Sequence, residues 1–361
     1  MSNCLLYSYQ NGRRTGLIEG IESLQWMPEW QSAGEFKLVC SCSEKNRSLL
    51  TDWGMLYNPD TPNIAALITY LDKTINKDGR TVIEARGEFT SCRWKGRAVL
   101  GDVDVTDAVS GILNIADANK RGLQVTTGES EEHSSIDYTA SWGSCYEAFC
   151  DIAEAGDIGF QHTFNPVTAE ETLDILTGTD RSDQTTDDYV GYFGTPPQNV
   201  ASASSILDYS DYGNVGVCNG EAPSEGDTFT QQVVYVGQTQ LTGNDRHEIY
   251  IDGSGVSHTY QVDDGQGGTT QATYTDAEYT VVLTNYAWAA LLKHMNALTI
   301  KLEARNTVPI YGTDYEMGDT MPIIIKEIGL RAKAMVTAVK LIYEESGKSM
   351  ELTFSKFELL E

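Results

Sequence analysis

The alternation of apolar and polar positions predicts that the chain begins with β-strands. In residues 1–100, apolar-rich runs such as GEFKLVCSC and RTVIEARGEFT are separated by turn-forming stretches such as NGRR, EWQSAG and YNPDTPN. The run IAALITYL at 64–71 is short enough to fit a helix. Its β-branched residues favour a strand, and the turn at 76–79 favours a hairpin, because its Asp-Gly pair supplies a positive φ.

Helical periodicity follows in three places. Segment 105–119 carries apolar residues at i, i+3 and i+4, which predicts an amphipathic helix with Thr106 as its N-cap. A second helix is expected from about Ser144 to Gly156, leading directly into the strand IGFQHTF. A longer helix is expected over 276–298. The two shorter helices with their strands predict a small α/β insertion.

Strand patterns return after residue 171 and dominate the end of the chain. The period-two runs are ETLDIL, TFTQQVVYVGQT, TIKLEARN, DTMPIIIK, LRAKAMVTAVKLIYEES and SMELTFSKFE. The Gly/Gln/Thr-rich stretch after residue 262 is expected to be an exposed loop or hairpin tip. The sequence therefore predicts a mainly β fold with α/β insertions.

The negative charge of the chain is concentrated in its middle. Of the formal net charge of −27, −24 falls in residues 121–290, where only Arg121, Arg181 and Arg246 are basic. A surface of this kind repels phosphates, so specific DNA or RNA binding by this region is not expected. The acidic residues either keep a large assembly component in solution or have a more directed role, and the sequence leaves both interpretations open.

Composition indicates a folded protein made in a cytoplasm. Hydrophobic residues make up 40% of the chain and charged residues 21%, which is typical of globular domains. No window has the apolar length needed to cross a bilayer, and the first residues lack the pattern of a signal peptide. The seven cysteines are therefore expected to be reduced thiols, and their spacing does not favour zinc.

No motif in the sequence predicts catalysis. The chain lacks GxSxG, HExxH, GxxxxGK[ST] and CxxC, and no EF-hand spacing occurs. The five histidines are widely scattered and are more simply interpreted as packing or surface residues: His133, His162, His247, His258 and His294. We therefore expect no catalytic residue, cofactor or metal, and a protein that is not an enzyme.

The stretch YGTDYEMGDTMPI, residues 311–323, holds the densest group of carboxylates near the C-terminus. Asp314, Glu316 and Asp319 are compatible with a cation site, an acid/base pair or a turn that precedes a strand. Their spacing does not follow the alternating oxygen ligands of a calcium loop.

A turn is the interpretation that explains the stretch best. Gly312 and Gly318 stand where a positive φ is needed, and Asp314 and Asp319 can accept hydrogen bonds from their own backbone in Asx turns. Residues 321–325 then alternate as a strand. These carboxylates are therefore expected to shape the backbone.

This stretch, followed by KLIYEESGKSMELTF, resembles the C-terminal signature of tail-tip or baseplate hub proteins of long-tailed phages, the siphovirus tail-associated proteins. Further matches occur in the order that the family shows. The resemblance rests on Trp26, Gly34 and Phe36 (GEFKLV), Gly87 and Arg97 (RGEFTSCRWKGR), Asp180 and Arg181 (GTDRS), Arg246, Tyr250 and Asp252 (RHEIYID), and Gly312, Asp314, Tyr315, Gly318 and Asp319.

The resemblance implies a fold with two related β-barrel domains of the tail-tube type. The first barrel is expected at 1–100, completed by 171–205, with the inserted α/β domain at 101–170. The second barrel is expected at 206–361, with an acidic insertion at about 241–297. Because each subunit would contribute two similar domains, a homotrimer would present a pseudo-sixfold face.

The resemblance also implies the function. A trimeric hub ring would adapt the sixfold tail tube to a threefold tip and surround the DNA channel at the baseplate of the virion. Its partners would be copies of itself, the distal tail or tail-tube protein, and spike or fibre proteins. DNA would only pass through, and the host surface would be contacted indirectly. The alternatives are a tail-associated cell-wall hydrolase and a tail module that binds host glycans through its many aromatic residues.

Overall fold

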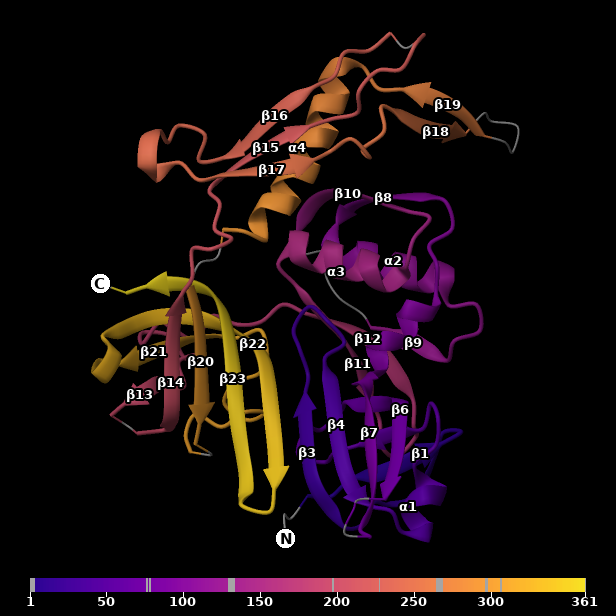
Figure 1. Ribbon diagram of the computed structural model, residues 1–361, viewed down its shortest axis with the longest axis vertical. Coiled ribbons are helices and arrows are strands. Elements are labelled where there is room, and N and C mark those ends of the chain that lie inside the picture. The colour runs from indigo at the N-terminus through magenta and orange to yellow at the C-terminus, as the bar shows by residue number, and fades with distance from the viewer. Residues whose placement is uncertain are drawn as a thin grey trace. The chain divides into compact units, whose positions relative to one another are not determined.

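The computed structural model describes residues 4–75, 77, 79–128, 134–196, 198–226, 228–263, 269–295, 298–305 and 307–360. Contacts between residues divide the chain into two compact units (Figure 1). Met1–Ser205 and Ile300–Glu361 together form the major unit, and Ile206–Thr299 forms the inserted unit. The inserted unit begins before the acidic insertion expected at 241–297. The expected domain boundaries remain a prediction.

The major unit is built on one sheet of thirteen strands, in the order β14-β20-β23-β22-β3-β4-β7-β6-β5-β1-β2, with β21 also paired to β22 and β13 to β21. The expected strands at both ends of the chain are confirmed. The strands are β1 (Tyr7–Gln10), β2 (Arg13–Leu17), β3 (Ile21–Met27), β4 (Glu35–Ser41), β5 (Met55–Tyr57), β6 (Ala65–Ile75), β7 (Thr81–Phe89), β13 (Phe193–Thr195), β14 (Val200–Leu207), β20 (Leu298–Ala304), β21 (Thr320–Ile325), β22 (Leu330–Glu344) and β23 (Gly347–Leu359). Two short helical turns accompany them, α1 (Glu44–Leu49) and η3 (Lys326–Ile328).

The sheet consists of two similarly ordered halves that meet where β22 pairs antiparallel with β3. At this seam Leu341 lies opposite Trp26, and Tyr343 lies opposite Leu24. Outward from the seam, one half runs β3-β4-β7-β6 and the other runs β22-β23-β20-β14. In the first half, the consecutive strands β3 and β4 lie next to the seam and the consecutive strands β7 and β6 lie outside them. In the second half, the consecutive strands β22 and β23 lie next to the seam, and outside them lie β20 and β14, between which the chain forms the inserted unit. The described strands close no barrel, so the expectation of two barrel domains is not confirmed.

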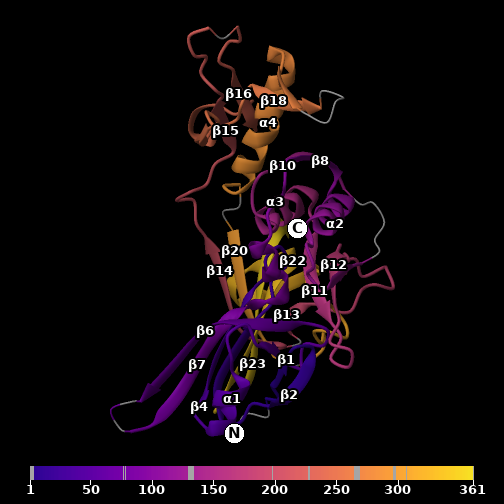
Figure 2. The ribbon, with the colours of Figure 1, turned by 90° about the vertical axis from the view of Figure 1, so that its right-hand side faces the viewer.

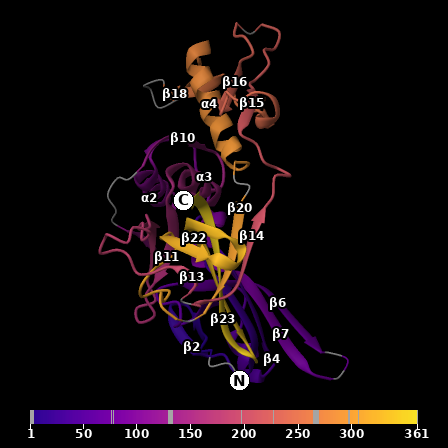
Figure 3. The same cartoon turned by 90° about the vertical axis from the view of Figure 1, so that its left-hand side faces the viewer.

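The predicted hairpin near residue 77 is present. Strands β6 and β7 pair antiparallel up to Ile75 opposite Thr81, and Gly79 has a positive φ of 79°. The other turn positions, Asn76 and Asp78, lie outside the described residues. Beyond Ile68 most of β6 is exposed, and Figures 2 and 3 show the hairpin extending away from the rest of the major unit.

An α/β layer belongs to the same unit. Helices α2 (Ala108–Asn119) and α3 (Cys145–Gly156) lie side by side (Figure 1). They pack with η1 (Thr90–Gly96), the strand pair β8 (Asp102–Asp107) and β10 (Ser135–Ser141), and the sheet β11 (Gly159–Phe164), β12 (Glu171–Leu176) and β9 (Val125–Thr127). Apolar residues of both helices form its core, among them Ile112 and Phe149.

Both predicted helices are confirmed, but one N-cap is wrong. Thr106 lies within β8, and the cap of α2 is Asp107. Its Oδ1 accepts a hydrogen bond from the backbone N–H of Ser110 at 2.8 Å. Strand β8 continues one residue further than the pattern indicated, which moves the cap by one position. Ser144 caps α3 as expected.

The inserted unit is a three-stranded sheet covered on one face by a helix. The sheet order is β16-β15-β17. Its elements are β15 (Val215–Asn219), β16 (Val233–Gly237), η2 (Gly243–Asp245), β17 (Glu248–Asp252), the hairpin β18 (Thr259–Asp263) and β19 (Thr269–Thr273), and α4 (Asp276–Leu292). The predicted long helix is confirmed and ends at Leu292. The Gly-rich stretch 264–268 lies outside the described residues.

Helix α4 is held by local and tertiary contacts. Thr275 and Glu278 form a capping box at its start. The hydroxyl of Tyr279 donates to the carbonyl of Val256 at 2.6 Å and accepts from the backbone N–H of Glu221 at 2.9 Å. Among the helices that the structure describes, none is long and apolar enough to cross a membrane.

Candidate functional site

Two sequence motifs that lie far apart in the chain meet at Asp319. Its side chain is buried and accepts from Nε of Arg181 at 2.6 Å, from the backbone N–H of Thr179 at 2.8 Å and from that of Glu316 at 2.9 Å. Two backbone hydrogen bonds between Thr320 and residues 179 and 181, both 2.9 Å long, align the segments. We call this arrangement the clasp. The Asp319 carboxylate stabilises the fold, because its three donors come from two distant segments of the chain.

The neighbouring signature residue Asp180 lies outside the clasp. Its carboxylate is exposed, accepts from the backbone N–H of Ser182 at 2.9 Å and lies 3.6 Å from Nζ of Lys333. Burial by itself would raise the pKa of Asp180, but the hydrogen bonds from Ser182 and the charge of Lys333 outweigh it and lower the pKa. Asp180 therefore orders the turn at the surface.

Gly318 of the clasp packs directly against Trp30. Its φ is +95°, and an added Cβ would lie 1.9 Å from the Trp30 ring. Gly159 also packs against this indole, because an added Cβ there would lie 2.6 Å from the ring. The next residue, Phe160, donates its backbone N–H to the Trp30 carbonyl at 3.2 Å. Trp30 is 1% exposed. It therefore joins the clasp, the loop between β3 and β4, and the first residue of β11.

The burial of Trp30 was not predicted, because the residues EWQSAG are typical of a turn. The signal was the residue type, since a large aromatic ring in a turn-forming segment is rarely left in solvent. What buries it is the absence of side chains at Gly159 and Gly318, two positions more than 100 residues away from it.

The turn before the clasp is arranged around Tyr315. This side chain is fully buried, and its ring meets Phe193 edge-on with centroids 5.5 Å apart. Burial raises the pKa of the Tyr315 hydroxyl, and the nearby Tyr311 and Asp314 raise it further. The backbone N–H of Gly312, whose φ is +79°, donates to the carbonyl of Tyr315 at 2.9 Å.

The carboxylates of this stretch bond to the backbone, but not in the expected Asx turns. Oδ2 of Asp314 accepts from the N–H of Ile310 at 2.7 Å, and Asp319 accepts from the N–H of Glu316. Each carboxylate thus bonds to a residue before it in the chain, whereas an Asx turn uses the residue two positions after it. The chain folds back toward these groups because Tyr315 and residue 319 are both buried.

Phe36 and Gly87 form a second cluster of signature residues, in the first half of the sheet. They lie opposite each other on β4 and β7. An added Cβ at Gly87 would lie 1.8 Å from the carbonyl oxygen of Leu67 and 2.9 Å from the Phe36 ring, which in turn packs on Trp26 with ring centroids 5.7 Å apart. Gly34 has a φ of +60° and lies against the carbonyl of residue 27. These residues shape the sheet.

Arg97 lies apart from both clusters, in the α/β layer. Its Nε donates to the carbonyl of Lys120 at 3.1 Å, at the end of α2. Arg121 makes a reciprocal contact, from its guanidinium to the carbonyl of Ala98 at 2.9 Å. The two arginines tie η1 to the last turn of α2. The signature residues of the major unit therefore form three separate structural groups. Arg246, Tyr250 and Asp252 lie apart from them, in the inserted unit.

A buried polar network in the α/β layer was not predicted. His162 accepts from the indole N–H of Trp94 at Nε2 (2.7 Å) and lies 3.2 Å from Glu171 at Nδ1. Arg93 donates twice to the Glu171 carboxylate, at 2.9 and 3.0 Å. Burial lowers the pKa of His162, although the attraction of Glu171 acts in the opposite direction. The neutral imidazole therefore carries its proton on Nδ1 and donates to Glu171.

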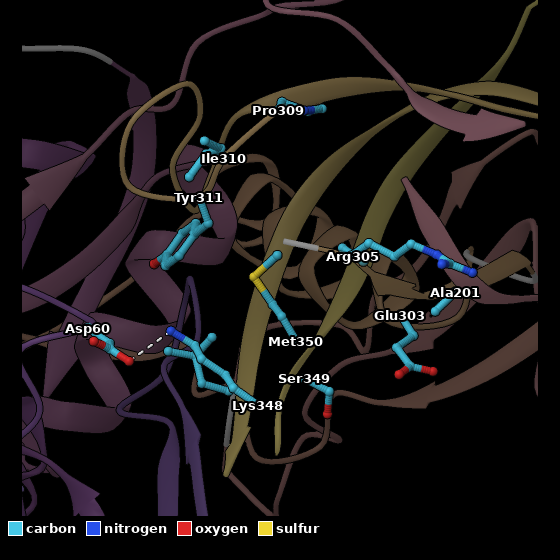
Figure 4. Close-up of a pocket in the computed structure, with 12 residues that line it drawn as sticks. Asp60, Ala201, Glu303, Arg305, Pro309, Ile310, Tyr311, Lys348, Ser349 and Met350 are labelled. Carbon is cyan, nitrogen blue, oxygen red and sulfur yellow. Dashed lines mark hydrogen bonds and ion pairs between the residues drawn. The ribbon is translucent and has the colours of Figure 1, made fainter. Parts of the chain in front are cut away.

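A pocket of about 200 Å³ opens where β20, β22 and β23 meet the loops at 60 and 309–311. Its lining combines the apolar Met350 with the carboxylates of Asp60 and Glu303 and the cations of Arg305 and Lys348. Figure 4 shows Lys348 reaching toward Asp60, at a distance of 2.8 Å. The charges are balanced, so the pocket has no preference for ligands of one sign.

No metal-ligand set emerges from this geometry. Within the ranges that the structure describes, no group of three or more His, Cys, Asp or Glu side chains is arranged to hold a metal ion. Of the carboxylates singled out in the sequence, those of Asp314 and Asp319 accept from the backbone, and that of Asp319 also accepts from Arg181.

The fold is that of phage tail proteins. A 43 kDa tail protein of prophage MuSo2 from Shewanella oneidensis superposes with a TM-score of 0.64 at 9% identity, covering 98% of both chains. A tail protein from Neisseria meningitidis MC58 superposes with a TM-score of 0.57 at 11% identity, and the match covers 98% of this chain and 96% of the other. Prophage tail protein gp18 from Listeria monocytogenes EGD-e superposes with a TM-score of 0.50 at 11% identity, and the match covers 98% of this chain and 94% of the other.

The sequence itself identifies the family within this class. Residues 8–355 match the family described as Siphovirus ReqiPepy6 Gp37-like protein, so the chain belongs to that family. No curated protein matches the sequence. The resemblance to siphovirus tail-associated proteins is thus confirmed.

Proposed function

We propose that this chain is the hub of the tail tip or baseplate, where three copies form a ring that adapts the sixfold tail tube to a threefold tip. The observation that carries the proposal is the repetition of one strand order on both sides of the β22–β3 seam. A chain that offers two similar sheet halves gives six of them in a trimer. Such a ring matches a sixfold tube on one face and a threefold tip on the other.

The edges of the sheet support assembly by strand pairing. In the described part of the sheet, β14 and β2 end the main row of strands and β13 ends the branch through β21, and each of the three is bonded to a neighbour on one side. An open edge presents unpaired backbone donors and acceptors to another chain. Pairing between copies would complete the two tube-type barrel domains expected from the sequence, which one chain alone leaves open.

The proposed partners follow from the place of such a ring. They are further copies of this chain, the distal tail or tail-tube protein, and the spike or fibre proteins of the tip. DNA passes through the ring without specific binding, because the excess of carboxylates in residues 121–290 repels phosphates. The chain would be made in the cytoplasm of the bacterial host and act in the virion.

We also propose that the chain is not an enzyme and works by shape. Its signature residues support the fold: the clasp carboxylate binds Arg181, and Gly87 and Gly318 make room for Phe36 and Trp30. A cell-wall hydrolase is the competing proposal. Clearing of a peptidoglycan zymogram by the purified chain would favour it.

The size and symmetry of particles formed by the purified chain test the hub. Mass photometry over a range of concentrations, together with negative-stain imaging, is expected to give the mass of three chains and threefold rings with a central opening. A chain that stays monomeric at every concentration, with no rings in the images, would contradict the proposal.

A second candidate function rests on the open face of the inserted unit. Across its three strands, Tyr235, Val217 and Tyr250 lie in one row, and the two tyrosines are 57% and 68% exposed. Flat, exposed aromatic rings of this kind suit stacking on the apolar faces of sugars. Binding of the full chain to host glycans on an array, lost when Tyr235 and Tyr250 are changed to Ser, would favour a host-binding module.

A further inference from the structure

Strand β6 has an open edge along its outer half. Near its start it lies between β5 and β7, but its pairing with β5 covers only residues 65–67. From Tyr70 to Ile75 the described residues of β6 pair with β7 alone, so the backbone groups on the other side are available to another strand. Tyr70 is 48% exposed and Ile75 is 72% exposed. This edge therefore presents two large side chains together with its open backbone groups.

Strand β14 has an open edge on the other half of the sheet. It contains no proline and no charged residue, which are the features that most often protect an exposed edge from pairing. Ser202 donates to Glu303 on the neighbouring β20 at 3.0 Å. Since side chains alternate along a strand, Ile206 lies on that same face, where it is 47% exposed. Ala201 lies on the opposite face and lines the pocket of about 200 Å³ (Figure 4).

The two edges belong to strands that run in opposite directions. They bound eight neighbouring strands of the sheet, in the order β14-β20-β23-β22-β3-β4-β7-β6. Each pair from β20 to β6 is antiparallel, and Figure 1 shows β14 and β20 pointing in opposite directions. Because the direction alternates over an even number of strands, β14 of one copy can pair antiparallel with β6 of a copy beside it.

A single register matches the side chains of the two edges. Tyr70 and Ile75 are five positions apart, as are Ala201 and Ile206. An antiparallel pair with Tyr70 opposite Ile206 therefore also places Ile75 opposite Ala201. The faces agree, because cross-strand neighbours lead from Tyr70 through β7, β4, β3, β22 and β23 to Glu303 along one face, which is that of Ile206. Ile75 then falls on the other face, beside the pocket.

The pocket beside Ala201 suits an aliphatic side chain. Its floor includes the apolar side chains of Leu341 and Met350, and the charged groups at its rim are of both signs. A cavity of roughly 150 Å³ is enough to hold a benzene molecule, so this pocket has room for the side chain of Ile75. Burial there would remove an exposed apolar group from water, which favours the contact.

The contact brings no like charges together. β14 is uncharged, and the stretch from Tyr70 to Ile75 carries one acid, Asp72, and one base, Lys73. Both edges are thus neutral in a chain whose formal net charge is −27. Each copy offers β14 to one neighbour and β6 to the other. Head-to-tail contacts of this kind close into a ring around an open centre when the rotation between copies allows it.

We propose that the outer half of β6 in one copy pairs antiparallel with β14 of the next, with Tyr70 beside Ile206 and Ile75 in the pocket beside Ala201. The inference rests on the proposed trimer and names the two edges that join its copies. It also explains why the β6–β7 hairpin extends away from its own unit, because a hairpin that pairs with a neighbouring copy has to reach beyond its own surface.

Disulfide cross-linking tests the pairing. The full chain carrying both Tyr70→Cys and Ile206→Cys is oxidised and run on a non-reducing gel beside the unaltered chain, which accounts for the seven native cysteines. Opposite residues of an antiparallel pair have Cα atoms about 5 Å apart, within the reach of a disulfide. Covalent trimers are expected at least tenfold above the unaltered chain, because each copy supplies one new thiol to each of its two neighbours.

Matched controls test the register. Tyr70→Cys alone and Ile206→Cys alone are expected to give no more cross-linked product than the unaltered chain, since each lacks the second thiol. Tyr70→Cys with Ser202→Cys keeps the same strands and the same face but moves one thiol by four residues, about 13 Å. It is expected to cross-link at least tenfold less. Equal yields from positions 202 and 206 would overturn the proposed register.

A charge placed in the pocket gives an independent readout. Ile75→Asp is expected to lower the fraction of trimer in mass photometry at least tenfold at equal concentration, because it would bury a carboxylate on the apolar floor. Ile75 is exposed in the single chain, so the variant is expected to fold, as circular dichroism can verify. Val167→Asp, at a 90% exposed position of the major unit, is the matched control and is expected to leave the fraction unchanged. Equal trimer fractions for both variants would overturn the pocket contact.

The possible results separate this inference from the hub proposal. Trimers in which positions 70 and 206 do not cross-link would overturn the inference and leave the hub intact. A chain that stays monomeric and gives no cross-links would overturn both.

Discussion

Arg181 and Asp319 lie 138 residues apart in the chain and form an ion pair of 2.6 Å in the major unit. Their side chains are 21% and 5% exposed, so water screens the pair only in part. The same carboxylate accepts two backbone N–H groups. The pair therefore joins the segment after β12 to the segment before β21. Substituting either residue removes a hydrogen-bonding partner from groups that are largely buried.

Asp319→Ala is expected to destabilise the protein by about 3 kcal/mol, because it leaves the Arg181 guanidinium and two backbone donors unpaired. Urea unfolding followed by tryptophan fluorescence measures the loss. Asp180→Ala is the matched control, since that carboxylate is exposed and its contact with Lys333 is long; about 1 kcal/mol or less is expected. Equal losses for both variants would contradict the clasp.

Gly318→Ala is expected to be among the most harmful single methyl additions in the chain. The new Cβ would lie 1.9 Å from the Trp30 ring on backbone with φ +95°, so the indole has to move. We expect a loss of about 3 kcal/mol or more, or a failure to fold. Thermal unfolding compared with the unaltered chain measures it.

Gly312→Ala separates crowding from backbone strain. Its φ of +79° is also positive, but no described atom lies within 4 Å of the added Cβ. A loss of about 1 kcal/mol is expected from the backbone alone. If Gly312→Ala lowers the stability as much as Gly318→Ala does, crowding of the new Cβ against Trp30 is not the reason why residue 318 has to be glycine.

His162 is expected to make stability depend on pH below neutrality. Burial holds its pKa in the folded protein below the ordinary value of 6.5. As the pH falls through 6.5, the unfolded chain binds a proton that the folded chain excludes, so the free energy of unfolding falls, by at most about 1.4 kcal/mol per pH unit. Urea unfolding at pH 7.5 and 5.5 measures this slope.

The variant His162→Gln is expected to flatten the slope between those pH values, because it removes the titrating group while keeping hydrogen-bonding atoms near Trp94 and Glu171. Glu171 also has a lowered pKa, but its contribution is lost only below its ordinary value of 4.5. His294→Gln, at a partly exposed position of the inserted unit, serves as control. An unchanged slope in His162→Gln would rule out this imidazole as the source.

The inserted unit is expected to be removable without unfolding the rest. The inserted unit, Ile206–Thr299, contains the connection from β14 to β20, whereas in the other half only residues 76–80 connect the corresponding strands β6 and β7. A chain in which a short Gly-containing turn joins Ser205 to Ile300 should keep its sheet. Circular dichroism and limited proteolysis measure this. Loss of cooperative unfolding would mean that the units depend on each other.

The sequence alone determined what depends on neighbouring residues. Period-two alternation located β22 and β23, and the i, i+3, i+4 spacing located α2, α3 and α4, because the pattern of a strand or helix repeats within a few residues. For β6, the β-branched residues and the turn that follows them indicated a strand. The positive φ expected at Gly312 and Gly318 was confirmed for the same reason, since a glycine acts on its own backbone, whereas the Asx turns expected at Asp314 and Asp319 were wrong. The ordered signature residues were enough to indicate the family.

Only the tertiary structure decided which distant residues meet. Nothing near Arg181 indicates that its partner is Asp319, and nothing in EWQSAG indicates that Trp30 is buried by Gly159 and Gly318. Likewise the repeat on the two sides of the β22–β3 seam joins strands from opposite ends of the chain. The physical reason is that burial and pairing depend on which residues become neighbours in space. The residues next to a given position in the chain do not show which distant residues these are.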